Sequence, residues 1–91
     1  MSNKILITIR ATNGTPWETS DFQLNQKVQV VVKRAVRHFV EAGVMSAGDY
    51  SLALVVEGRA IELADDASLE KAGVVPGATL ALMARGPQVD G

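Results

Sequence analysis

Alternating isoleucines mark the start of the chain, at Ile5, Ile7 and Ile9. This alternation predicts a half-buried β-strand over residues 4–10, because successive side chains of a strand point to opposite faces. The Asn-Gly pair within residues 12–16 predicts a turn, since glycine accepts a positive φ and the proline that follows interrupts ladder pairing. A second strand is expected over residues 17–24, so the chain opens with a β-hairpin.

Between residues 27 and 41 the hydrophobic period lengthens to three and four residues. The apolar side chains with this spacing are Val28, Val31, Val32, Ala35, Val36, Phe39 and Val40. They fall on one face of an α-helix, and many are β-branched, so packing rather than intrinsic propensity must stabilise it. Asn25 is expected to cap the start of this helix, and Gly43 is expected to end it.

The last third of the chain alternates between apolar runs and turn residues. Strands are expected over residues 51–56, 59–63 and 78–85. Glu57 and Gly58 form the turn between the first two, and residues 67–73 predict a single helical turn capped by Asp65 or Asp66. The one long helix must then cover one face of a mixed sheet, because it is the only large amphipathic surface.

Residues 54–63, LVVEGRAIEL, resemble a strand, a glycine turn and a short strand of ubiquitin. Residues 69–74 and 76–80 resemble the leucine-containing turn and the Thr-Leu strand that follow in that family. The resemblance implies an α+β fold, the ubiquitin-like β-grasp, with a mixed sheet of four to five strands packed on one α-helix, plus a short helical turn. It implies a ubiquitin-like domain at 1–85 and a flexible tail at 86–91. The chain is most similar to small bacterial ubiquitin-like modifiers of conjugation operons.

The tail after the last predicted strand reads GPQVDG and ends at Gly91. A terminal glycine lacks the Cβ that would clash in a narrow enzyme channel. The resemblance implies that an ATP-dependent activating enzyme adenylates Gly91 and that a conjugating enzyme joins it to amines of target proteins. A deconjugating metalloprotease would reverse the link. Gly86 is the alternative end if the tail is cleaved, and Arg85 is the side chain that the activating enzyme would read.

On this interpretation the protein is the passenger of conjugation, not an enzyme, and it needs no cofactor of its own. Two other functions stay open. A non-conjugating binding module, similar to the ubiquitin-like component of type VII secretion systems, needs no reactive tail. A sulfur carrier, similar to those of molybdopterin and thiamine synthesis, forms a thiocarboxylate at its terminal glycine. Those carriers end in Gly-Gly, whereas this chain ends in Val-Asp-Gly.

A second candidate site is an apolar patch on the solvent face of the sheet. Alignment with the recognition patch of ubiquitin places Val55 and Met83 there, with Ala53 and Ala81 flanking them. The residues expected to face the helix are Leu52, Leu54, Val56, Leu80, Leu82 and Ala84. An exposed apolar pair predicts a partner-binding patch; the alternative is that both residues only cover the sheet.

Composition narrows the classes of function. The chain of 91 residues is expected to form one domain, and it has no cysteine for disulfides, thiolate nucleophiles or zinc. Its net charge of −1 gives no bulk attraction to nucleic acid or to an anionic membrane. The basic residues of the predicted helix are Lys33, Arg34, Arg37 and His38. They are interpreted as a solvated face, since nucleic-acid binding predicts more charge and interleaved aromatic residues.

No metal site is expected, because His38 is the only histidine and residues 62–66 lack the pattern of a calcium loop. Trp17 is expected to pack at the sheet edge. The start of the chain reads as a strand rather than a secretory signal, and no apolar run reaches the ~20 residues of a membrane span. A cytoplasmic location is therefore expected.

Overall fold

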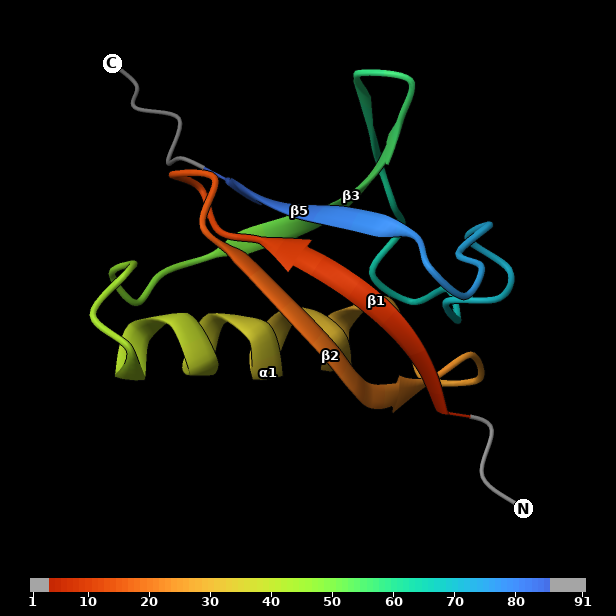
Figure 1. Cartoon of the computed structure of the whole chain (residues 1–91), viewed down its shortest axis with the longest axis horizontal. Helices are drawn as coiled ribbons and strands as arrows, with labels where there is room; N and C mark the ends of the chain where they lie inside the picture. The colour runs from red at the N-terminus through yellow and green to blue at the C-terminus, as the bar shows by residue number, and fades with distance from the viewer. Residues whose placement is uncertain (1–3, 86–91) are drawn as a thin grey trace.

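The computed structural model describes residues 4–85. Its elements are β1 (Lys4–Arg10), β2 (Pro16–Gln23), α1 (Val28–Glu41), β3 (Tyr50–Val56), β4 (Arg59–Glu62) and β5 (Thr79–Ala84). The strands form one mixed sheet in the order β2-β1-β5-β3-β4. β1 and β5 run parallel, and the other neighbours are antiparallel. α1 lies across one face of this sheet (Figure 1), so the predicted α+β architecture is confirmed.

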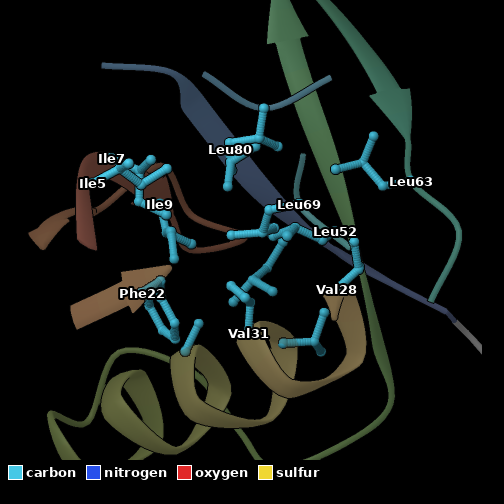
Figure 2. Packing of buried hydrophobic residues seen from close by; sticks show 14 of the residues in the cluster. Ile5, Ile7, Ile9, Phe22, Val28, Val31, Leu52, Leu63, Leu69 and Leu80 are labelled. Atoms are coloured by element: carbon cyan, nitrogen blue, oxygen red, sulfur yellow. The ribbon is translucent and has the colours of Figure 1, made fainter. Parts of the chain in front are cut away.

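The core lies between α1 and the sheet, where side chains from every layer meet (Figure 2). The predicted alternation of β1 is confirmed, since Ile5, Ile7 and Ile9 are all buried. The buried residues contributed by α1 are Val28, Val31, Val32, Ala35 and Phe39. Leu69, from the segment between β4 and β5, is fully buried among them. Each large apolar side chain buried in this way contributes about 1.5–3 kcal/mol.

The first turn of α1 is capped by a distant loop and not by Asn25. The N-cap residue is Lys27, and no side chain caps the helix. Instead the N–H of Val28 donates to the Ala67 carbonyl at 2.9 Å, and the N–H of Gln29 donates to the Asp65 carbonyl at 3.0 Å. These bonds satisfy orphan donors of the helix start and fix the loop after β4 against it.

Gly43 ends α1 as predicted. It has a φ of 76°, which glycine adopts without the cost of a Cβ. The N–H of Val44 reaches back to the Phe39 carbonyl at 2.9 Å, and the N–H of Gly43 donates to the Val40 carbonyl at 3.0 Å. The chain therefore leaves the helix in a closed turn that leads towards β3.

The predicted helical turn at 67–73 is present as one hydrogen-bonded turn, too short to be assigned as a helix. The N–H of Ala72 donates to the Ser68 carbonyl at 3.0 Å. The cap is the Ser68 hydroxyl, which accepts from the Lys71 N–H at 3.1 Å. The prediction of an Asp65 or Asp66 cap is therefore wrong.

The predicted strand phase holds in the middle of the sheet and fails at two strand ends. Leu52, Leu80 and Leu82 are buried as expected. Val56 is 41% exposed, and Ala84 is also exposed. The β3–β4 hairpin projects away from α1 (Figure 1), so within residues 4–85 no helix covers the inner face of its tip.

Candidate functional site

Arg85 follows β5 directly and is fixed by bonds to three segments of the chain. Its backbone N–H donates to the Asp49 carbonyl at 3.0 Å. Its Nη2 donates to both carboxylate oxygens of Asp65, at 3.0 and 2.9 Å. Nη1 lies 3.8 Å from Asp49 Oδ1, and Nη2 lies 4.0 Å from Glu62 Oε2. We call these four residues the Arg85 clasp.

The Arg85 clasp ties the end of β5 to the far side of the sheet. Glu62 ends β4, and β3 lies between β4 and β5 in the sheet, so the contact of Arg85 with Glu62 spans β3. The loop that carries Asp65 also accepts a hydrogen bond from the first turn of α1. The clasp therefore couples the root of the C-terminal segment to both layers of the fold.

The electrostatics of the Arg85 clasp favour the charged guanidinium. The hydrogen bond to Asp65 raises the pKa of Arg85 above its ordinary value, partial desolvation opposes the rise, and the charges of the surrounding carboxylates add to it. The Arg85 side chain nevertheless keeps 36% of its surface exposed. The predicted recognition residue is thus already paired within the chain, while about a third of it stays open to a partner. Gly91 and the alternative Gly86 lie outside the described residues.

The predicted patch on the outer face of the sheet is smaller than expected. Met83 is 40% exposed, and Val55 and Ala81 are half-buried. Ala53 is fully buried. Its side chain is a single methyl group, and it lies between Ala81 on β5 and Glu62 on β4. Its assignment to a partner-binding surface is therefore wrong.

Val55 and Met83 are also not neighbours across the sheet. Met83 pairs with Ser51, whereas Val55 pairs with Thr79. The two apolar residues are thus separated by four positions along the strands, or about 13 Å at the usual rise per residue. Val55 and Met83 therefore lie at two separate places on the sheet and do not form one continuous apolar patch.

The sequence analysis missed a more exposed apolar pair on the β3–β4 hairpin. Val56 is 41% exposed and Ile61 is 51% exposed, and Ile61 pairs with Leu54 on β3. The signal in the sequence was the Glu-Gly pair directly after Val56, which predicts a tight turn. In the structure Glu57 has a φ of 50° and Gly58 a φ of 81°. A hairpin this tight continues both strands past the single helix that must cover them.

Part of the basic face of α1 is occupied by aromatic contacts. The His38 ring stacks on Trp17 with centroids 3.9 Å apart and planes at 9°. The Arg34 guanidinium lies 5.0 Å from the centroid of the Phe22 ring. Trp17 therefore packs at the β2 edge, as predicted, and these two basic residues help to cover that edge. Arg37 instead pairs with Glu41 at 3.3 Å on the exposed helix surface.

Within residues 4–85 no group of His, Asp or Glu side chains is arranged to hold a metal ion. No helix in that range has the length and apolarity to cross a membrane.

Comparison with known proteins supports the fold and goes no further. No family model matches the chain, and no curated protein matches it in sequence. Solved structures do match, and the three described here share 19–23% identity with this chain. A ubiquitin-like protein from Trypanosoma brucei has a TM-score of 0.67 and 21% identity, covering 94% of this chain and 100% of that one.

Two further matches illustrate the range of the fold. A de novo protein designed on ubiquitin has a TM-score of 0.65 and 23% identity, with 100% of both chains covered. The EccD5 ubiquitin-like domain from Mycobacterium xenopi has a TM-score of 0.64 and 19% identity, covering 89% of this chain and 93% of that one. The chain therefore has the ubiquitin-like β-grasp fold. Each of these three neighbours is ubiquitin-like or ubiquitin-based, and none is described as an enzyme.

Proposed function

We propose that this chain is a ubiquitin-like protein modifier whose C-terminal Gly91 is activated by an ATP-dependent enzyme and joined to amines of target proteins. The observation that carries the proposal is the Arg85 clasp in a ubiquitin-like fold. It fixes the last described residue beside Asp49 and Asp65, so the segment that follows starts from a defined point. An activating enzyme, a conjugating enzyme and a deconjugating metalloprotease are the proposed partners, and the cytoplasm, where ATP is available, is the proposed location.

The part of Arg85 that stays exposed is the proposed contact for the activating enzyme. A guanidinium that is held in place presents its remaining N–H donors at lower entropic cost than a free side chain does. Gly91 is the proposed site of activation. The charged Asp90 beside it is the feature that an activating enzyme of this chain must accommodate.

A second candidate function is a non-conjugating binding module, comparable to the ubiquitin-like domain of EccD5. The observation that favours it is the exposed apolar pair Val56 and Ile61 on the β3–β4 hairpin, a contact surface that needs no reactive tail. A sulfur carrier is a third candidate function, and a terminal thiocarboxylate would identify it.

The tryptic remnant of the tail tests the proposal directly. Trypsin cleaves after Arg85, so a target lysine joined to Gly91 would keep the segment GPQVDG as a branched peptide. An N-terminally tagged chain is purified under denaturing conditions from the cells that naturally make it, and its adducts are digested and sequenced by mass spectrometry. A lysine carrying GPQVDG is the expected result.

Each other outcome of that experiment identifies a different reactive end or a different function. A single-glycine remnant would assign the reactive end to Gly86. A chain with a terminal thiocarboxylate and no branched peptide would indicate a sulfur carrier. Intact chain with neither modification, in cells where it is bound to folded partners, would support the binding module and contradict conjugation. A chain lacking Gly91 serves as the matched control and should give no adduct.

A further inference from the structure

A groove of about 450 Å³ runs along α1 on the side away from β2. One wall is the helix face that carries Val32, Val36 and Val40, and the other is the loop of residues 47–49 that leads into β3. Arg85 and Asp65 line the groove as well. The groove therefore lies beside the point where the C-terminal segment leaves the sheet.

The base of the groove is apolar. Val36 and Tyr50 are half-buried and pack against the core, and Val40, also half-buried, lines the groove beside them. The Tyr50 hydroxyl donates to the Ser46 carbonyl at 2.7 Å. This bond holds the tyrosine side chain in place and occupies its polar end. The surface left open to a ligand is thus formed by aliphatic side chains and an aromatic ring.

The helix rim of the groove carries positive charge that the described residues neutralise only in part. Lys33 is exposed and makes no ion pair within residues 4–85. Arg37 pairs with Glu41 at 3.3 Å, but both side chains are mostly exposed, so water screens this pair strongly. On the opposite rim, the carboxylates of Asp49 and Asp65 both face Arg85. The groove therefore has a positive helix rim beside its apolar base, and its carboxylates lie on the opposite rim.

The groove also borders a stretch of β3 that has a strand on one side only. β4 pairs with β3 from Ala53 onward, and the N–H of Leu63 donates to the Leu52 carbonyl at 2.8 Å. Main-chain groups alternate in direction along an antiparallel strand, so those of Tyr50 point the same way as those of Leu52, away from β5. No strand of the described chain pairs with Tyr50 on that side.

We infer that this groove docks an extended segment of a partner protein that carries aliphatic side chains followed by acidic residues. The aliphatic side chains would pack on Val36 and Val40, the main chain would bond to Tyr50, and the carboxylates would face Lys33 and Arg37. Main-chain pairing at an open strand edge with side chains in a neighbouring groove is a general mode of peptide recognition. The inference holds for a modifier and for a binding module alike, because it uses only the folded domain.

Titration of the ¹⁵N-labelled chain with capped synthetic peptides tests the inference. The first probe alternates valine and serine and ends in a run of aspartates, and the second replaces the aspartates with asparagines. We expect amide shifts to change around Val36, Val40 and Tyr50, and the asparagine peptide to bind about tenfold more weakly. Shift changes confined to another face, equal affinity for the two peptides or no binding would overturn the inference.

Two charge reversals on the same helix provide the matched comparison. Lys33→Glu should weaken binding of the aspartate peptide by about tenfold, because it reverses the charge at the groove rim. Arg34→Glu makes the same change in net charge, but this side chain lies over Phe22, outside the groove. It should change affinity by no more than about twofold. Equal losses in both variants, or concentration-dependent shifts at the groove without peptide, which would indicate a second copy as occupant, would contradict the inference.

Discussion

The two ends of β3 have similar apolar sequences and opposite environments. At the start of the strand, Leu52 is fully buried beneath α1, and the Arg85 clasp ties the neighbouring segments together. At the end of the strand, Val56 is 41% exposed, and Ile61 on the paired strand is 51% exposed. Leu52 and Val56 nevertheless belong to one continuous strand, β3.

This difference shows that the covering layer, and not the pattern of the strand, decides which residues are buried. One helix of 14 residues covers the central strands and leaves the β3–β4 hairpin uncovered (Figure 1). The clasped end is therefore expected to govern stability, and the hairpin is free to contact other molecules. Three pairs of substitutions test this contrast.

The largest effect is expected from truncating side chains at the two ends. Leu52→Ala should lower the free energy of unfolding by about 2–5 kcal/mol, because it leaves a cavity in the core. Ile61→Ala removes a comparable side chain from the exposed hairpin and should change it by about 0.5 kcal/mol or less. Urea denaturation of both variants measures the contrast. Equal losses would show that the hairpin is part of the cooperative core.

A smaller effect is expected from backbone strain at the hairpin turn. Gly58 has a φ of 81°, and an added Cβ would meet nothing within 4 Å, so Gly58→Ala tests conformation alone. It should cost about 1–2 kcal/mol, the penalty of an L-residue in the left-handed region. Gly48→Ala is the control at the clasped end, where a Cβ would meet Tyr50 Cε2 at an ordinary 3.5 Å. If Gly48→Ala lowered the free energy of unfolding as much as Gly58→Ala, the loss at Gly58 could not be assigned to its positive φ.

The smallest effect on stability is expected from charge removal. Arg85→Leu should lower Tm slightly and Arg59→Leu, on the hairpin, should leave it unchanged, because Arg59 makes no ion pair within residues 4–85. The difference should shrink as salt is added, since exposed ion pairs are screened. A Tm difference that does not respond to salt would mean that packing of the arginine stem, rather than its charge, stabilises the clasp.

The pH dependence of that difference follows from the raised pKa of Arg85. A cation whose folded pKa is raised stabilises the fold at every pH below its unfolded value and loses this effect only as pH rises through the folded value. For arginine that range lies in strongly alkaline solution. Titration of Arg85 itself should therefore add no slope to the Tm difference around neutral pH.

The order of elements was predictable because it depends on local periodicity. The isoleucine alternation and the helical spacing of the valines each describe one surface, and Gly43 ends the helix by its own conformation. Contacts between segments were not predictable in this way. The carbonyls of Asp65 and Ala67 cap α1, which no pattern near the helix start reveals.

The candidate site was predicted in part. Met83 is exposed as expected, since the phase of β5 follows from its two leucines. The burial of Ala53 depends on its neighbours across two strands, and the sequence does not show which side chains lie there. The carboxylates of Asp49, Glu62 and Asp65 stand near strand ends in the sequence, but only the sheet order brings them to Arg85. The role of Gly91 stays a prediction.

The most direct test of the account is transfer from a chain shortened by Gly91. Wild type, the shortened chain and a chain extended by one tryptophan are incubated with ATP and lysate of the native cells, and covalent adducts are resolved by denaturing electrophoresis. The account predicts adducts from wild type alone, with the same Tm for all three, because the described fold ends before this residue. Adducts from the shortened chain would contradict the role of Gly91. So would the absence of adducts from wild type in a lysate that does form adducts with the protein made by those cells.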